Sequence, residues 1–275
     1  MRRSTLALLL ALVACTALPS HRVAPAQRRI VALIPSFVED LIAIGATRQI
    51  VGVSSGTQDI PAVRRVPLVA DYASVDAERL VALHPDVVVA IPAQMRFLTN
   101  VQSGGIEVEQ LPDDAYADIF TDLRRLGAIS GHERNAAAEI ARLQATTTRM
   151  RKGERHFARP PSIFFVIGAQ PIWTVGNGSY IATLVALAGG RNAAGDLGGA
   201  YGEYSAEALL RAQPDAIVTD PSTQIQSVLD REPWRSLHAV RLHHVFVIAN
   251  ASLLERPGPR YTEGLAWLIA QLRSL

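Results

Sequence analysis

The chain contains an internal duplication, and this feature constrains its fold more than any other. Residues 36–45 align without gaps with residues 179–188, and each block places apolar residues at helical spacing before small residues that end a helix. Each block also follows a short apolar segment, residues 29–34 in the first copy and residues 163–167 in the second. The pattern predicts a strand followed by a helix, formed twice.

A second pair of blocks, residues 72–89 and 201–218, matches in the same order. A tyrosine opens each block, and an alanine–glutamate pair, a leucine, a proline–aspartate pair and a valine follow at identical positions. Asp76 and Ser205 are suited to cap the start of a helix, and the proline ends that helix before a β-branched strand. The matched blocks lie farther apart in the first copy, and we expect the extra residues to form a loop.

The order strand, helix, strand is typical of parallel α/β sheets. Its repetition predicts an α/β protein with two parallel-sheet lobes and a ligand cleft between them. Residues 115–126 and 132–152 show helical periodicity, with a break at residues 127–131. The second segment is long enough for one helix of roughly 30 Å, which we interpret as a rigid linker. The predicted organisation is an N-terminal lobe at 29–126, a linker helix region at 127–158 and a C-terminal lobe at 159–275.

Residues 1–14 are typical of a bacterial signal peptide. Two arginines precede a short apolar run that is too short to span a bilayer. The run ends at residues 12–15, Leu-Val-Ala-Cys, which resembles the lipobox of bacterial lipoproteins, and Cys15 is the only cysteine in the chain. We expect lipidation of Cys15, a flexible tether over residues 15–28, and a location outside the cytoplasmic membrane, either periplasmic or membrane-anchored. Ordinary cleavage after Ala26 is the alternative.

The charge balance and the available motifs argue against several function classes. Lys+Arg number 27 and Asp+Glu number 25, and the arginines are scattered, which excludes a dedicated nucleic-acid binder. Residues 52–56 match the G-x-S-x-G pattern of serine hydrolases, but a turn and a proline follow where that motif requires a helix. An exported hydrolase using Ser54 stays an alternative. A zinc- or manganese-binding protein is another, although the seven histidines have no metal-ligand spacing and we predict no metal site.

The order of five short stretches carries a family resemblance. The stretches are 29–52, 76–90, 173–179, 188–192 and 256–260. Together with the export signal and the duplication, they resemble the class III substrate-binding proteins of bacterial ABC importers, which deliver cobalamin, haem or ferric siderophores. The resemblance covers almost everything after residue 28.

That resemblance implies a function in transport and no enzymatic activity. It implies two lobes joined by a rigid helix, a ligand held in the cleft, and delivery to a dimeric permease whose ATPase is a separate chain. No resident cofactor is expected, because the metal chelate is the cargo. Among such ligands we expect cobalamin first, then haem, then a ferric siderophore.

Tyr72 and Tyr201 are the first candidate ligand-binding residues. They occupy equivalent positions in the two copies, each just before a helix. Equivalent loops of two facing lobes should meet at the cleft, where a pair of aromatic rings suits a flat macrocycle. In the family, cobalamin binders often carry aromatic residues near these places, and some haem binders use a tyrosine oxygen as iron ligand. The alternative is that each tyrosine only packs its own loop.

Four further residues are ligand-binding candidates. Trp173 lies in a loop flanked by proline and glycine, and Ser36 and Phe37 stand at a helix start whose N–H groups can hold a polar group. Phe37 matches Tyr180 in the second copy, so both are equally interpretable as hydrophobic staples. Arg256 opens a loop that resembles a cleft-edge loop of the family, where it can bind an anionic group, or it can be a solvated arginine.

Glu78 and Glu207 are candidates for docking to the permease. Both fall in the first turn of a predicted helix, where a glutamate is favourable to the helix dipole. In the resembled family, one glutamate on each lobe docks onto arginines of the permease. The same register in both copies favours this docking role.

Overall fold

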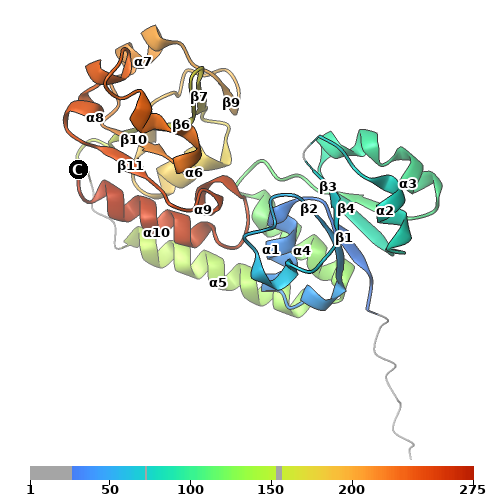
Figure 1. Ribbon diagram of the computed structural model, residues 1–275. Helices are drawn as coiled ribbons and strands as arrows, with labels where there is room; N and C mark the ends of the chain where they lie inside the picture. Colours follow the sequence, from blue (N-terminus) through green and yellow to red (C-terminus); the bar gives the residue numbers. More distant parts are fainter. Residues whose placement is uncertain (1–26, 72, 153–156) are drawn as a thin grey trace, which may run out of the picture.

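The computed structural model describes residues 27–71, 73–152 and 157–275, and these form two α/β lobes above one long helix (Figure 1). The predicted fold class is therefore confirmed. The signal peptide and Cys15 lie outside the described residues, so the predictions for them stay untested. Within the described part of the chain, no helix is both long and apolar enough to cross a membrane.

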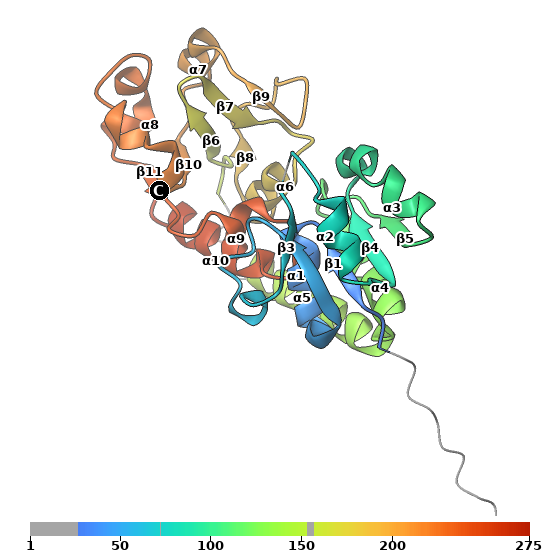
Figure 2. The same cartoon turned by 45° about the vertical axis from the view of Figure 1, so that its right-hand side comes forward.

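The N-terminal lobe is built on a five-stranded sheet in which every pairing is parallel and the strand order is β3-β2-β1-β4-β5. Its strands are β1 (Ile30–Ala32), β2 (Ile50–Ser54), β3 (Leu68–Ala70), β4 (Val87–Ala90) and β5 (Glu107–Gln110). Its helices are α1 (Pro35–Ala43), α2 (Ala77–Ala82), α3 (Thr99–Ser103) and α4 (Asp118–Ser130). Helices α1 and α4 cover one face and α2 and α3 the other, which explains why β1 and β4 are buried throughout (Figure 2).

The C-terminal lobe has a mixed sheet, in contrast to the wholly parallel one predicted. Its order is β11-β10-β6-β7-β9, with β8 also paired to β6, and the β6–β7 and β7–β9 pairs are antiparallel. Two residues separate β6 from β7, too few for the crossover that a parallel pair needs. The strands are β6 (Ser162–Ala169), β7 (Ile172–Val175), β8 (Arg191–Asn192), β9 (Tyr201–Glu203), β10 (Ala216–Thr219) and β11 (Val245–Val247). The helices are α6 (Tyr180–Leu187), α7 (Ala206–Ala212), α8 (His238–Arg241), α9 (Ser252–Glu255) and α10 (Tyr261–Leu272).

The helix starts predicted from the duplication are confirmed. The Asp76 side chain accepts the backbone N–H of Arg79 at the start of α2, and the Ser205 side chain accepts that of Ala208 at the start of α7. The extra residues of the first copy are more than the expected loop, because they include the short helical turn Pro61–Val63 and the edge strand β3.

The linker is helix α5 (Glu133–Lys152), whose 20 residues span about 30 Å at 1.5 Å per residue. The predicted break before it is displaced: α4 continues through Gly127, and the chain turns at Gly131, which has a φ of +74°. A Cβ atom at Gly127 would lie 2.7 Å from the Cβ of Ala136, so glycine is needed there for the close approach of α4 to α5.

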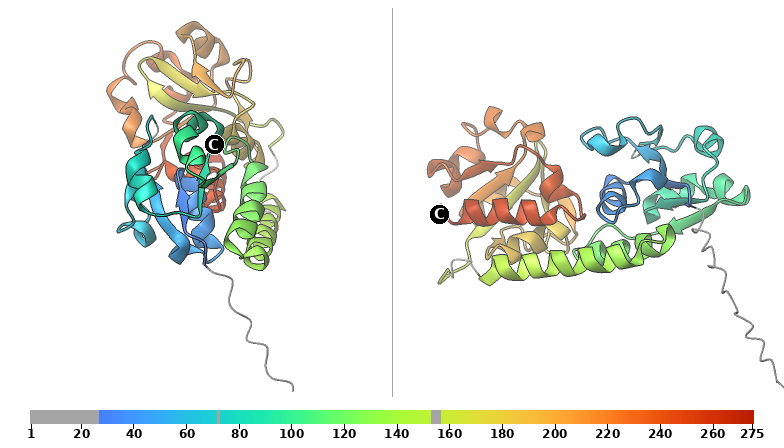
Figure 3. Two further views of the ribbon diagram at one scale, coloured as in Figure 1. Left: turned by 90° about the vertical axis from the view of Figure 1, so that its right-hand side faces the viewer. Right: turned by 90° about the horizontal axis from the view of Figure 1, so that it is seen from below.

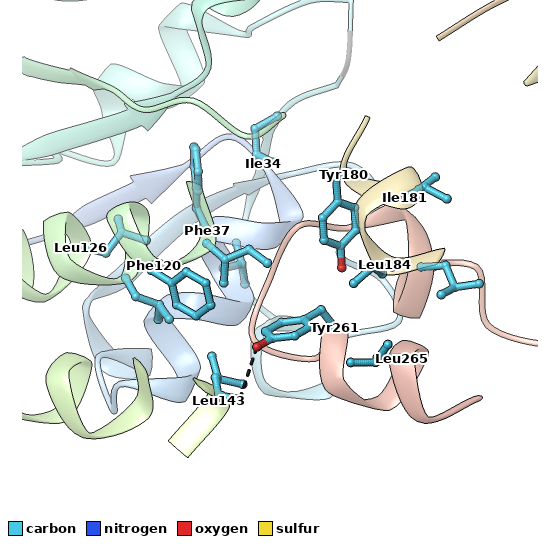
Figure 4. Close-up of a cluster of buried hydrophobic side chains, with 14 of the residues drawn as sticks. Ile34, Phe37, Phe120, Leu126, Leu143, Tyr180, Ile181, Leu184, Tyr261 and Leu265 are labelled. Atoms are coloured by element: carbon cyan, nitrogen blue, oxygen red, sulfur yellow. Dashed lines mark hydrogen bonds between the residues drawn. The ribbon is translucent and has the colours of Figure 1, made fainter. Parts of the chain in front are cut away.

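The two lobes share one hydrophobic core, which the sequence does not reveal. Phe37 and Phe120 from the N-terminal lobe join Leu143 of α5, Tyr180 of α6 and Tyr261 of α10 in a single cluster (Figure 4). The Tyr261 hydroxyl lies 2.7 Å from Thr147 Oγ1 and donates to the carbonyl oxygen of Leu143. Helix α10 also packs along α5 (Figure 3). The base of the molecule is therefore one packed unit rather than two lobes on a bare helix.

Candidate ligand-binding site

A hollow of about 340 Å³ lies between the two lobes, as the fold prediction requires. This volume falls within the range of roughly 300–1,000 Å³ that is usual for small-molecule sites. The lining residues from the N-terminal lobe are Ile34, Ile91, Asp113 and Asp114, and those from the C-terminal lobe are Ile167, Ile181, Tyr201, Glu255 and Pro257. The first group follows the carboxyl ends of β1, β4 and β5, the edge at which parallel α/β sheets bind ligands.

Tyr201 presents an exposed aromatic ring at this cleft, and Trp173 is exposed on the neighbouring strand. Tyr201 lines the hollow and is 44% exposed, and Trp173, on the neighbouring strand β7, is 43% exposed. In the β7–β9 register Val175 pairs with Tyr201 and Trp173 pairs with Glu203, so both aromatic side chains project from the same face of the ladder. The strand pair carrying them lies on the side of its lobe that faces the N-terminal lobe (Figure 1).

Tyr72 lies outside the described residues, so its position opposite Tyr201 stays a prediction. Its neighbour Asp71 follows β3 directly, at the same sheet edge from which Ile34 and Ile91 line the hollow. The Asp71 carboxylate accepts the backbone N–H groups of Ala73 and Ser74, both at 2.7 Å. These hydrogen bonds lower the pKa of Asp71.

Phe37 is a correction to the predicted site. Its side chain is fully buried in the shared core, as is its counterpart Tyr180, so it does not reach the cleft. Ser36 is also buried, but its hydroxyl donates to Asp113 Oδ1 at 2.8 Å. Ser36 therefore orients a carboxyl group of the cleft wall and does not itself line the hollow.

Arg256 is a second correction. Its guanidinium Nη1 lies 3.0 Å from Glu39 Oε1, and Nη2 lies 3.0 Å from Asp59 Oδ1 and donates to the carbonyl oxygen of Gly56 at 2.6 Å. All three acceptors belong to the N-terminal lobe, so the guanidinium joins the lobes, and Arg256 is not among the residues that line the hollow. The residues on either side, Glu255 and Pro257, line the hollow.

Three carboxyl groups give the hollow an acidic lining that the sequence reasoning missed: Asp113, Asp114 and Glu255. Burial raises the pKa of Asp113 to about 8, although the Ser36 hydroxyl opposes the shift. Burial also raises the pKa of Glu255, with Asp220 adding to the effect. Among the described lining residues there is no lysine, arginine or histidine. The sequence could have indicated this lining, because Asp113 and Asp114 follow the carboxyl end of the parallel strand β5.

Glu78 and Glu207 are both exposed, one on each lobe, in the first turns of α2 and α7 (Figure 1). Glu207 forms an ion pair with Arg211 one turn along the same helix. This exposure is compatible with docking, and also with favourable placement at the helix dipole.

The two alternative functions find no support in the geometry. Ser54 is buried at the end of β2, a turn follows it, and its hydroxyl has no hydrogen-bond partner among the described residues. A hydrolase nucleophile requires a helix directly after the strand and a base within reach. No group of three or more His, Cys, Asp or Glu side chains in residues 27–71, 73–152 and 157–275 is placed to hold a metal ion.

Comparisons with known proteins agree with this architecture. The uncharacterized ABC transporter substrate-binding lipoprotein YvrC of Bacillus subtilis (strain 168) is 26% identical over 246 residues, covering 86% of this chain and 77% of the relative. The vitamin B12-binding protein of Pectobacterium carotovorum subsp. carotovorum (strain PC1) is 28% identical over 252 residues, covering 90% and 89%. The crystal structure of the periplasmic vitamin B12-binding protein BtuF of Vibrio cholerae superimposes with a TM-score of 0.77 at 25% identity, covering 90% of this chain and 97% of that one.

The family model for periplasmic binding proteins matches residues 30–251. This match runs from β1 to the residue before α9 and so includes both sheets and the linker helix. The chain belongs to the periplasmic binding protein family.

Proposed function

We propose that this protein is the extracytoplasmic substrate-binding component of an ABC importer. It holds a small molecule between its lobes, catalyses nothing, and delivers the molecule to a dimeric permease whose ATPase is a separate chain. Membership of the family, the interlobe hollow and the similarity to an ABC transporter substrate-binding lipoprotein support this assignment.

Among the expected ligands, the chemistry of the lining favours cobalamin. The observation that carries this proposal is the lining itself: an exposed tyrosine together with carboxyl groups and, among the described residues, no cationic side chain. The flat corrin ring of cobalamin suits aromatic stacking, and its primary amides donate hydrogen bonds that carboxyl oxygens accept. Two relatives are named as vitamin B12-binding proteins, which supports the same ligand.

Haem and ferric siderophores fit the lining less well. Haem carries two propionate groups, and the described lining offers no cationic side chain to pair with them. Arg256, the residue expected to neutralise an anionic ligand, is already bound to Glu39 and Asp59. The lack of a cationic side chain in the described lining supports placing cobalamin before haem and ferric siderophores.

Two further parts of the proposal concern the membrane. Lipidation of Cys15 would tether the protein outside the cytoplasmic membrane, and the lipoprotein name of the Bacillus relative supports this. Glu78 and Glu207, exposed on separate lobes, would contact arginines of the permease.

Titration of the purified protein with cyanocobalamin, haemin and a ferric hydroxamate tests the ligand assignment. We expect cyanocobalamin to bind with a Kd below about 10 μM, which corresponds to roughly −7 kcal/mol, and haemin to bind more weakly. Asp114→Lys should bring the affinities for cyanocobalamin and haemin closer together, because it places a cation beside the other carboxyl groups of the cleft. Tighter binding of haemin than of cyanocobalamin by the unmodified protein would overturn the assignment.

A further inference from the structure

Arg256 of the C-terminal lobe crosses to the N-terminal lobe, where Glu39 of α1 and Asp59 and Gly56 of the loop after β2 hold it. We call these four residues the interlobe clamp. Both nitrogen-to-carboxylate distances are 3.0 Å, and the exposed fractions of the Arg256 and Glu39 side chains are only 18% and 5%. The Arg256–Glu39 pair is therefore screened by salt less than a surface pair, whereas the Asp59 side chain is 40% exposed and its pair with Arg256 is open to screening.

The loop that carries Arg256 is held stiffly against α1. Pro257 and Pro259 restrict its backbone, and Gly258 packs so closely that a Cβ atom there would lie 3.3 Å from Glu39 Oε2. The same Cβ atom would lie 3.7 Å from the Cα of Ser36. The loop and α1 therefore form one tight contact between the lobes.

This contact adjoins the cleft wall on both sides. Glu255 and Pro257, the direct neighbours of Arg256, line the hollow from the C-terminal lobe. From the N-terminal lobe, Ser36 donates to Asp113, which lines the hollow opposite them. A change in the clamp would move the two walls of the cleft relative to each other.

We propose that the interlobe clamp fixes the width of the ligand cleft and thereby sets how long the ligand stays bound. Arg256 is a positioning residue in this scheme and does not touch the ligand. Its effect on ligand residence rests on the proposed function, whereas its effect on lobe spacing does not. Ionic strength should weaken the Arg256–Asp59 half of the clamp, because the Asp59 side chain is 40% exposed and lines a second hollow of about 500 Å³ that opens to solvent.

The lobe spacing can be measured directly, because Cys15 is the only cysteine. In a Cys15→Ser background, Val81→Cys on α2 and Arg211→Cys on α7 place one exposed spin label on each lobe. Pulsed electron–electron double resonance should give one narrow distribution of the distance between the two spin labels in this parent protein. Adding Arg256→Gln should broaden and shift it.

The matched control is Arg125→Gln, which removes an arginine–glutamate pair confined to the N-terminal lobe. It should leave the interlobe distance unchanged. An unchanged distance distribution in Arg256→Gln would overturn the proposal. If Arg256→Gln does not fold, Asp59→Asn removes one of the two carboxylate partners and is judged by the same criterion.

Ligand kinetics give the second readout. With cyanocobalamin in a stopped-flow experiment, Arg256→Gln should raise the dissociation rate constant roughly tenfold and change the association rate constant far less. High salt should raise the dissociation rate of the parent protein toward that of the variant. Equal dissociation rates in parent and variant would contradict the residence-time role. Failure of cyanocobalamin to bind would refute the ligand assignment. The distance measurement would then decide alone whether the interlobe clamp fixes the width of the cleft.

Discussion

At the scale of single residues, the cleft combines the exposed ring of Tyr201 with carboxyl groups whose protonation is altered by burial. Because the pKa of Asp113 is about 8, this group is mostly protonated at neutral pH. A protonated carboxyl both donates and accepts hydrogen bonds, and so matches a primary amide, which does the same. This pairing is a residue-level reason to expect an amide-bearing ligand.

Replacement of Tyr201 tests the aromatic contribution to binding. Tyr201→Ala should lower the affinity for cyanocobalamin roughly tenfold, because stacking adds about 0.5–1.5 kcal/mol to the area that the ring buries. Tyr201→Phe should keep most of the affinity. Leu242→Ala is the control, since Leu242 is similarly exposed, at 47%, beyond the end of α8. Equal losses in Tyr201→Ala and Leu242→Ala, measured by calorimetry, would refute a specific role for the ring.

The site residues differ in how far the sequence could predict them. Tyr201 was predictable as a cleft residue because its position is duplicated, although it begins strand β9 and does not lie in the loop that the duplication indicated. The burial of Phe37 was not predictable, because a position at the start of a helix does not show which way its side chain faces. The ion pairs of Arg256 were not predictable either, because its partners Glu39 and Asp59 are distant in sequence and no local pattern connects them.

At the scale of elements, the predictions held where signals were local. The caps Asp76 and Ser205, and the prolines that end the same helices, placed α2, β4, α7 and β10 correctly. The hairpin of β6 and β7 was missed because strand direction depends on pairing, not on the composition of either strand. Gly127 was wrongly predicted to break the helix. A glycine that ends a helix and a glycine that lets a second helix pack closely look the same in the sequence.

Substitution of Gly127 tests the close approach of α4 to α5. Gly127→Ala should destabilise the protein by about 1–3 kcal/mol, because the added methyl group meets Ala136. Without that clash, alanine in a helix would instead stabilise by up to about 1 kcal/mol. Gly198→Ala is the control, because a Cβ atom there has nothing within 4 Å. Urea unfolding measures both variants, and a more stable Gly127→Ala would contradict the packing described.

The packing of α1 against α4 predicts an unusual pH dependence. Asp40 and Asp122 are buried on these helices with no hydrogen-bond partner for either carboxyl group among the described residues. Burial raises the pKa of Asp122 to about 8 and that of Asp40 well above its usual value. A group whose pKa is raised by folding contributes stability at low pH and loses it as pH rises through the folded-state value.

The free energy of unfolding should therefore fall as the pH rises from about 5 to about 8, with a slope of up to about 1.4 kcal/mol per pH unit for each such group. The lowered pKa values of Asp71, Asp215 and Glu232 act in the opposite direction, but only at acidic pH. Asp122→Asn should reduce the slope. Urea unfolding at pH 5.5 and pH 8.5 checks this, and greater stability at the higher pH would disprove it.

At the scale of the whole molecule, three features hold the lobes together: helix α5, the shared core around Tyr261 and the interlobe clamp. The sequence predicted the first, because one long segment without proline has a clear helical period. The core and the clamp arise only when distant elements meet, so they were not predictable. Together they favour small changes in cleft width over a wide hinge motion.

Cobalt itself gives the most direct test of a cobalamin carrier. Crystals grown with cyanocobalamin and measured at the cobalt absorption edge would locate the metal by its anomalous signal. The proposed function predicts a single cobalt peak between the lobes, with the corrin ring against Tyr201 and amide groups near Asp113 and Glu255. A cobalt peak elsewhere on the molecule, or an empty cleft at saturating cyanocobalamin, would contradict it.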